Sequence, residues 1–141
     1  MNHPVEPAVL VALVDAARRA RQRAYAPYSK FAVGAAVLDE HGHIHAGCNV
    51  ENAAYPQGWC AEATALAHLV MAGGLRVHAV AVVGDAPAPV TPCGGCRQKL
   101  REFAADDVPV IVADLQAVRA RFTLGELLPA SFGPDHLALQ P

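Results

Sequence analysis

The sequence contains few charged residues and no long apolar run. Only 17% of its 141 residues are charged, and the formal net charge is −2. This composition offers no strongly positive surface for nucleic acid or for an anionic membrane. No apolar run reaches the roughly 20 residues that a membrane-spanning helix needs. The first residues, MNHPVEPAVL, lack the charged start and apolar centre of a signal peptide. We therefore expect a cytoplasmic protein that binds neither nucleic acid nor membrane.

The abundant apolar residues indicate a globular protein. They make up 53% of the chain, and 141 residues are enough for one domain with its own core. We therefore expect residues 1–141 to form a single domain. A monomer with so many apolar residues would expose hydrophobic patches, so burial in an oligomer is expected as well.

Hydrophobic periodicity predicts an alternation of helices and strands. Two strands are expected within 31–50, around the turn DEHG. Further strands are expected at 77–84, 108–113 and 119–124. Helices are expected at 9–25, 60–74 and 93–104, and a short helix followed by a tail is expected at 125–137. This alternation is typical of an α/β protein, a three-layer α/β/α sandwich with a mixed, roughly five-stranded sheet.

Four cysteines in a reducing compartment favour metal binding or catalysis over disulfides. Cys93 and Cys96 form a C-x-x-C pair at a helix start, which by itself fits a zinc half-site, a redox dithiol or two buried small residues. The pair comes late in the chain, unlike the redox pair of a thioredoxin-like unit. Cys60, at another expected helix start, is the natural third ligand. We expect Cys48, at a strand end, to be a buried structural thiol.

Three protein ligands leave one zinc position open, as in catalytic sites. Water in that position can have its pKa lowered from 15.7 to about 7. Glu62 follows Cys60 by two residues, near enough to take a proton from that water without being a ligand. An isolated glutamate in a first helical turn would more simply interact with the helix dipole. Beside these cysteines, Glu62 is a candidate general acid and base.

Three histidines, at positions 41, 43 and 45, alternate along an expected strand and its turn. Alternation places them on one face, where a metal site is conceivable. Exposed strand residues commonly show the same pattern, and we favour that interpretation.

The segment CAE at 60–62, followed by PCGGCRQ at 92–98, resembles the signature of zinc-dependent nucleoside deaminases. The chain is similar in particular to the cytidine deaminase family of the small homotetrameric type. The likeness extends over four segments in the same order, at 25–38, 47–66, 92–103 and 126–137. It implies a cytidine deaminase-like fold, one Zn²⁺ per chain and a homotetramer that acts on a small nucleoside.

The resemblance also implies roles for single residues. Cys60, Cys93 and Cys96 would hold zinc, and Glu62 would transfer protons. The residues implied in substrate binding are Asn49 and Glu51 for the ribose hydroxyls, Phe31 for stacking on the pyrimidine, the Ala61 backbone for the base edge, and Tyr55 and Phe132 for a neighbouring subunit's site.

The implied reaction is hydrolysis of cytidine and deoxycytidine to uridine and deoxyuridine, in pyrimidine salvage. Glu62 would protonate ring N3 and then assist the departure of ammonia. A deaminase of a modified or antibiotic cytosine nucleoside, of the blasticidin type, is a close alternative. A polynucleotide-editing domain would need a basic channel and aromatic platforms, and only 6% of the residues are aromatic. A non-catalytic zinc module or a thiol oxidoreductase is the third alternative.

One position departs from the family pattern, in which arginine follows the CAE segment. This chain has Ala63 there. Three thiolates around Zn²⁺ leave a net charge of −1, which makes the metal a weaker Lewis acid unless a cation offsets it. Two helix N-termini, Arg97 or another subunit are possible sources of positive charge. Trp59 is bulky and is a candidate to fill the space of the missing arginine.

Overall fold

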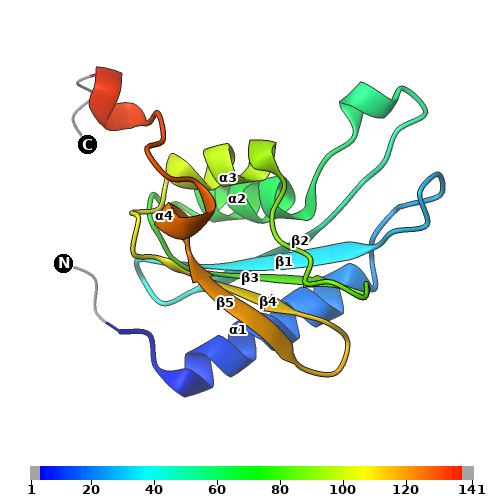
Figure 1. The fold of residues 1–141 in the computed structure, drawn as a ribbon, viewed down its shortest axis with the longest axis horizontal. Coiled ribbons are helices and arrows are strands. Elements are labelled where there is room, and N and C mark those ends of the chain that lie inside the picture. Colours follow the sequence, from blue (N-terminus) through cyan, green and yellow to red (C-terminus); the bar gives the residue numbers. More distant parts are fainter. Residues whose placement is uncertain (1–3, 138–141) are drawn as a thin grey trace.

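The computed structural model describes residues 4–137, which form one mixed five-stranded sheet between two helical layers (Figure 1). The strand order is β2-β1-β3-β4-β5, and only β3 and β4 pair in parallel. The strands are β1 (Val33–Asp39), β2 (Ile44–Cys48), β3 (Val77–Gly84), β4 (Pro109–Ala113) and β5 (Val118–Thr123). The expected fold class is confirmed.

Helix α1 (Pro7–Arg21) covers one face of the sheet, and helices α2 (Ala61–Met71) and α3 (Gly94–Arg101) lie side by side on the other (Figure 1). The remaining helical elements are η1 (Tyr55–Gln57), α4 (Leu124–Leu127) and η2 (Pro134–Leu137). Helix α1 ends four residues before the expected boundary at 25. No helix in the described part of the chain is long and apolar enough to cross a membrane.

The central strands have both faces buried, as their nearly continuous apolar sequences predict. Alternate residues of β3 therefore belong to two cores. Val80 and Val82 pack with Leu66 and Leu100 beneath α2 and α3, while their neighbours in β3 pack with Leu13 beneath α1.

Two glycines allow the helices to approach the sheet closely. A Cβ atom on Gly47 of β2 would collide with the backbone of α2 at Ala65, and one on Gly34 of β1 would collide with the backbone of α1 at Ala17. Because α2 lies directly on β2, the strand fixes the position at which this helix begins.

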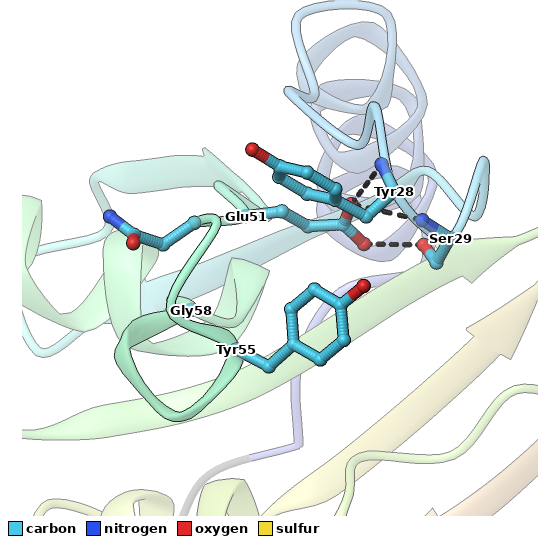
Figure 2. A pocket seen from close by; sticks show the side chains of 6 residues that line it. Tyr28, Ser29, Glu51, Tyr55 and Gly58 are labelled. Carbon is cyan, nitrogen blue, oxygen red and sulfur yellow. Dashed lines mark hydrogen bonds between the residues drawn. The ribbon is translucent and has the colours of Figure 1, made fainter.

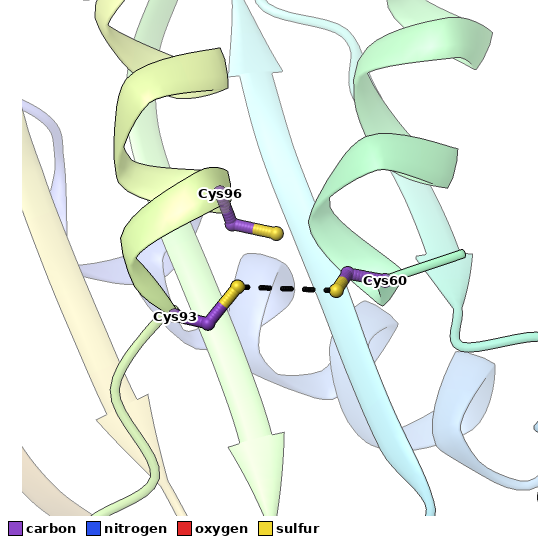
Figure 3. A group of neighbouring side chains, drawn as sticks. All are labelled: Cys60, Cys93 and Cys96. Carbon is purple, nitrogen blue, oxygen red and sulfur yellow. Dashed lines mark hydrogen bonds between the residues drawn. The ribbon is translucent and has the colours of Figure 1, made fainter. Parts of the chain in front are cut away.

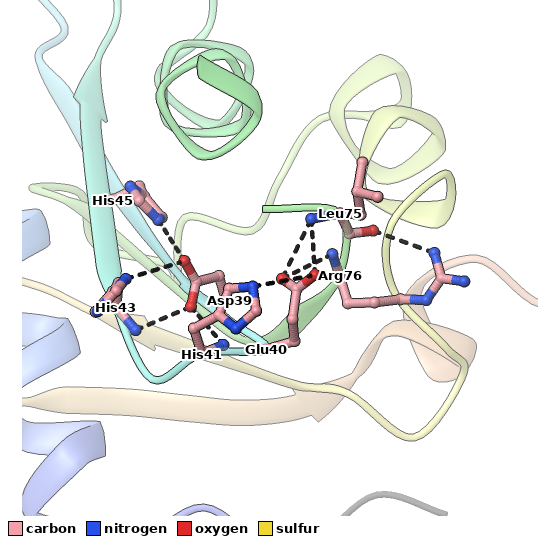
Figure 4. Close-up of polar contacts among 7 residues, drawn as sticks. All are labelled: Asp39, Glu40, His41, His43, His45, Leu75 and Arg76. Carbon is pink, nitrogen blue, oxygen red and sulfur yellow. Dashed lines mark hydrogen bonds and ion pairs between the residues drawn. The ribbon is translucent and has the colours of Figure 1, made fainter. Parts of the chain in front are cut away.

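A buried carboxylate holds the turn between β1 and β2 (Figure 4). Asp39, only 2% exposed, accepts hydrogen bonds from the backbone N–H groups of His41 and His43 at 2.8 and 2.9 Å, and Nε2 of His45 lies 2.7 Å from its other oxygen. Burial acts to raise the pKa of Asp39, but these hydrogen bonds outweigh it and lower the pKa from 3.8 to about 2. The turn is thus held by the His45 side chain and by the backbone of His41 and His43. Among the described residues, the three histidine side chains form no group spaced for a metal.

We predict that Asp39→Asn lowers the free energy of unfolding at pH 7 by about 1.5–3 kcal/mol, the range for hydrogen bonds to a charged group. Because the pKa of Asp39 is lower in the folded protein, its contribution is complete above the ordinary value of 3.8 and is lost as the pH falls through about 2. Denaturant unfolding of both proteins between pH 7 and pH 2 checks this. A stability difference that stays constant over that range would contradict the assignment.

Candidate metal centre and active site

Three thiols converge where α2 and α3 begin (Figure 3). Cys60 is the N-cap residue of α2, Cys93 is the N-cap residue of α3, and Cys96 lies in the first turn of α3. Their sulfur atoms all lie within 4.8 Å of one another, and the Sγ atoms of Cys60 and Cys93 are 3.9 Å apart. A disulfide bond is about 2.05 Å long, so these thiols are not bonded to each other.

The spacing of the sulfur atoms suits zinc. Tetrahedral zinc with Zn–S bonds of about 2.3 Å places its sulfur ligands about 3.8 Å apart, close to the separation of Cys60 and Cys93. Cys96 is buried, whereas Cys60 and Cys93 are exposed, so the cluster faces solvent on one side. Cys48 is half-buried, not fully buried as expected, and does not belong to the cluster. The cluster therefore offers three ligands.

The thiols do not ionise together readily without a cation. Burial raises the pKa of Cys60, and burial together with the Glu62 charge raises that of Cys96 well above its ordinary value. Burial also acts to raise the pKa of Cys93, but hydrogen bonding, chiefly from the backbone N–H of Cys96, lowers it overall. A divalent cation supplies the charge that would allow all three to become thiolates.

The Glu62 side chain interacts with the thiol cluster. It is the second residue of α2, is only 4% exposed, and its carboxylate accepts a hydrogen bond from the Cys96 thiol. Burial raises its pKa above the ordinary value of 4.5. A buried carboxyl group with a raised pKa takes up and returns protons more readily near neutral pH than an exposed one.

The segment that contains Asn49 and Glu51 runs beside the start of α2. Val50 exchanges two backbone hydrogen bonds with Trp59, each 2.8 Å long, directly before Cys60. The Asn49 side chain accepts a hydrogen bond from the Val33 N–H and donates one to the Phe31 carbonyl, both at 2.9 Å. Asn49 therefore links the loop at Phe31 to the metal centre.

The Glu51 carboxylate lines a cavity of about 270 Å³ (Figure 2). It accepts hydrogen bonds from the backbone N–H groups of Tyr28 and Ser29 and from the Ser29 hydroxyl, and these hydrogen bonds lower its pKa. Tyr28 and Tyr55 both line this cavity, and their ring centroids are 5.7 Å apart. Sequence reasoning missed Tyr28 and Ser29, since only the fold brings their loop to Glu51.

The other predicted substrate residues are spread over the molecule. Ala61 is buried as the first residue of α2, and Phe31 is partly exposed. Tyr55 and Phe132 are 75% and 56% exposed. Their segments lie at opposite sides of the helical layer in Figure 1, and the Phe132 ring stacks on His136. One chain does not bring Tyr55 and Phe132 together.

The structure shows the surroundings of Arg97 and Trp59, the two residues suggested to compensate for the missing arginine. The guanidinium group of Arg97 donates to the carbonyl oxygens of Pro92 and Leu127 at 2.7 and 2.8 Å and to the Thr91 hydroxyl at 3.0 Å, so it is directed to these oxygens and not to the thiols. Trp59 is 52% exposed, whereas Ala63 is buried.

Comparisons with known proteins agree with this site. The family described as the cytidine and deoxycytidylate deaminase zinc-binding region matches residues 9–112. A cytidine deaminase of Sporosarcina psychrophila is 44% identical over 126 residues, which cover 89% of this chain and 93% of that protein. The cytidine deaminase of Mycobacterium tuberculosis H37Rv is 43% identical over 121 residues, 86% of this chain and 87% of that protein.

A solved structure shows the same fold. The crystal structure of cytidine deaminase from Burkholderia pseudomallei matches with a TM-score of 0.81 and 45% identity, and the match covers 86% of this chain and 98% of that one. The family match spans most of the chain, including all three clustered cysteines. The chain belongs to the cytidine and deoxycytidylate deaminase family, whose zinc-binding region it contains.

Proposed function

We propose that this protein hydrolyses cytidine and deoxycytidine to uridine and deoxyuridine, with one zinc ion per chain held by Cys60, Cys93 and Cys96. The observation that carries the proposal is the convergence of these three thiols beside the buried Glu62. Relatives that are 43–45% identical over most of this chain are named cytidine deaminases, which supports the same reaction here.

Glu62 performs the proton transfers of this reaction. When bound, zinc supplies a Lewis acid that lowers the pKa of water. The Glu62 carboxylate accepts a proton from the water and delivers it to N3 of the base, so that C4 becomes open to attack by the oxygen. The carboxylate then takes the second proton, from the hydroxyl group added at C4, and delivers it to the amino group. The C4–N bond breaks, a carbonyl forms at C4 and ammonia departs. The raised pKa of Glu62 suits a group that must both accept and donate.

Four residues bind the nucleoside, and one of them, Glu51, lines the cavity. Asn49 and Glu51 offer an amide and a carboxylate to the ribose hydroxyls, and the loop contacts described above orient both. Phe31 presents a partly exposed ring for stacking on the pyrimidine. The backbone N–H of Ala61 belongs to the first turn of α2, where N–H groups have no partner within the helix, and it binds the base edge.

The proposal includes a homotetramer in which Tyr55 and Phe132 complete the sites of neighbouring subunits. Both aromatic side chains are exposed in the single chain, as are Tyr25, Val50 and Met71. Exposed aromatic and aliphatic side chains of this number favour burial between subunits. The proposal also includes a cytoplasmic location and a role in pyrimidine salvage, since free thiols that bind metal persist in a reducing compartment.

We predict that Glu62→Gln retains one zinc per chain but loses deamination by about 100-fold to 10,000-fold, the usual contribution of a general acid and base. Metal analysis and the loss of ultraviolet absorbance on addition of cytidine measure the two properties. Wild-type protein is assayed beside it with cytidine, deoxycytidine and blasticidin, and with single-stranded DNA as competitor. Full activity of the variant, a wild-type protein without zinc, or a preference for blasticidin would contradict the proposal.

We predict that Phe132→Ala lowers kcat/KM for cytidine by about tenfold to a hundredfold, the usual cost of losing one aromatic stacking partner of a base. If Phe132 acts in a neighbouring subunit, co-expression with Glu62→Gln chains restores activity, because some sites then combine an intact Glu62 with an intact Phe132. Activity of mixed oligomers that merely equals the sum of the two parent variants would exclude this contribution. Light scattering of the same samples gives the number of subunits.

A further inference from the structure

The metal centre carries more negative charge than the residues described so far offset. Three thiolates and one zinc ion leave −1, and an ionised Glu62 adds another negative charge. The N-termini of α2 and α3 each contribute roughly half a positive charge. Arg97 is directed to carbonyl oxygens. A further cation close to the site would strengthen zinc binding.

Ala63 lies on the side of α2 that faces α3. The opposite side of α2 packs on β2, where the Thr64 hydroxyl donates to the Cys48 carbonyl at 3.0 Å and Nδ1 of His68 lies 2.7 Å from the Ala46 carbonyl. Helices α2 and α3 contact each other side by side (Figure 1). The position at which the family pattern has arginine is therefore directed toward α3 and is buried.

Lys99 lies on the side of α3 that faces α2. Arg97 and Arg101 point the other way, toward the Leu127 carbonyl and the Ser131 hydroxyl. Lys99 is two residues from each, and successive helical residues are about 100° apart, so it lies on the opposite side. Cys96, three residues before Lys99, is its neighbour on the helix surface, and the Cys96 sulfur lies within 4.8 Å of the Cys60 sulfur at the start of α2.

The Lys99 side chain also runs back toward the start of α3. Its Nζ lies 3.7 Å from the position that a Cβ atom on Gly95 would occupy, one residue before Cys96. Side chains in helices point toward the N-terminus, so a lysine four residues after Gly95 reaches this position in an ordinary conformation. Gly95 has no side chain to displace the ammonium group.

We propose that Lys99 is the cation that offsets the excess negative charge of the zinc centre, in place of an arginine at position 63. The proposal rests on the zinc site of the proposed function and assigns its missing positive charge to the facing helix. Lys99 touches neither zinc nor substrate. It is a positioning residue that stabilises the thiolates and Glu62 through its charge.

Lys99→Gln tests the proposal by zinc affinity, measured by competition with a chromophoric chelator, and by cytidine turnover. We expect zinc to bind about tenfold to a hundredfold more weakly, the usual effect of losing an outer partner of a metal site. Lys99→Arg keeps the charge and should bind zinc like the wild type. The control is Arg23→Gln, which removes one exposed positive charge beyond the end of α1, on the other face of the sheet. This control should leave both measurements unchanged.

Restoration by a second substitution separates charge from packing. In the Lys99→Gln background, Ala63→Arg should restore zinc affinity to within a few-fold of the wild type, because it returns a cation to the same interface. The proposal is overturned if Lys99→Gln binds zinc as tightly as the wild type, if Arg23→Gln weakens binding equally, or if neither arginine substitution preserves affinity. A wild-type protein that holds no zinc or leaves cytidine unchanged would instead overturn the proposed function.

Discussion

The site depends on two helix N-termini that lie next to each other with a sulfur atom at each N-cap. Cys60 and Cys93 occupy positions where side-chain oxygens usually satisfy the first backbone N–H groups. Here the first backbone N–H groups and the helix dipoles make a positive environment for thiolates. Cys96 and Glu62 follow within the first turns, so the same two helix starts supply the metal ligands and the proton carrier.

The sheet holds these helix starts in place. Gly47 allows α2 to lie directly on β2, and the Val50–Trp59 hydrogen bonds fix the chain just before Cys60. Arg97 ties the start of α3 to Pro92 and to the carbonyl of Leu127 at the end of α4. Neither helix start can shift without breaking such contacts, and this rigidity keeps three sulfur atoms within range of one ion.

The sequence alone predicts features that depend on local patterns. The apolar run at 77–84 has the same bounds as β3. The positions of the cysteines indicated the three thiols that the fold brings together. Features that depend on distant segments were missed. Ser29 lies 22 residues from Glu51, and Arg97 lies 30 residues from Leu127, so only the folded chain reveals that they are partners. The role proposed for Lys99 could not be predicted from the sequence, because it depends on α2 and α3 lying side by side.

X-ray absorption at the zinc edge tests the central claim most directly, since it counts the atoms around the metal in the intact protein. The account predicts three sulfur atoms at about 2.3 Å and one oxygen or nitrogen at about 2.0 Å, with the light atom changing when a cytidine analogue binds. Four sulfur ligands, or a shell without sulfur, would contradict the claim that Cys60, Cys93 and Cys96 hold zinc with one position left for chemistry.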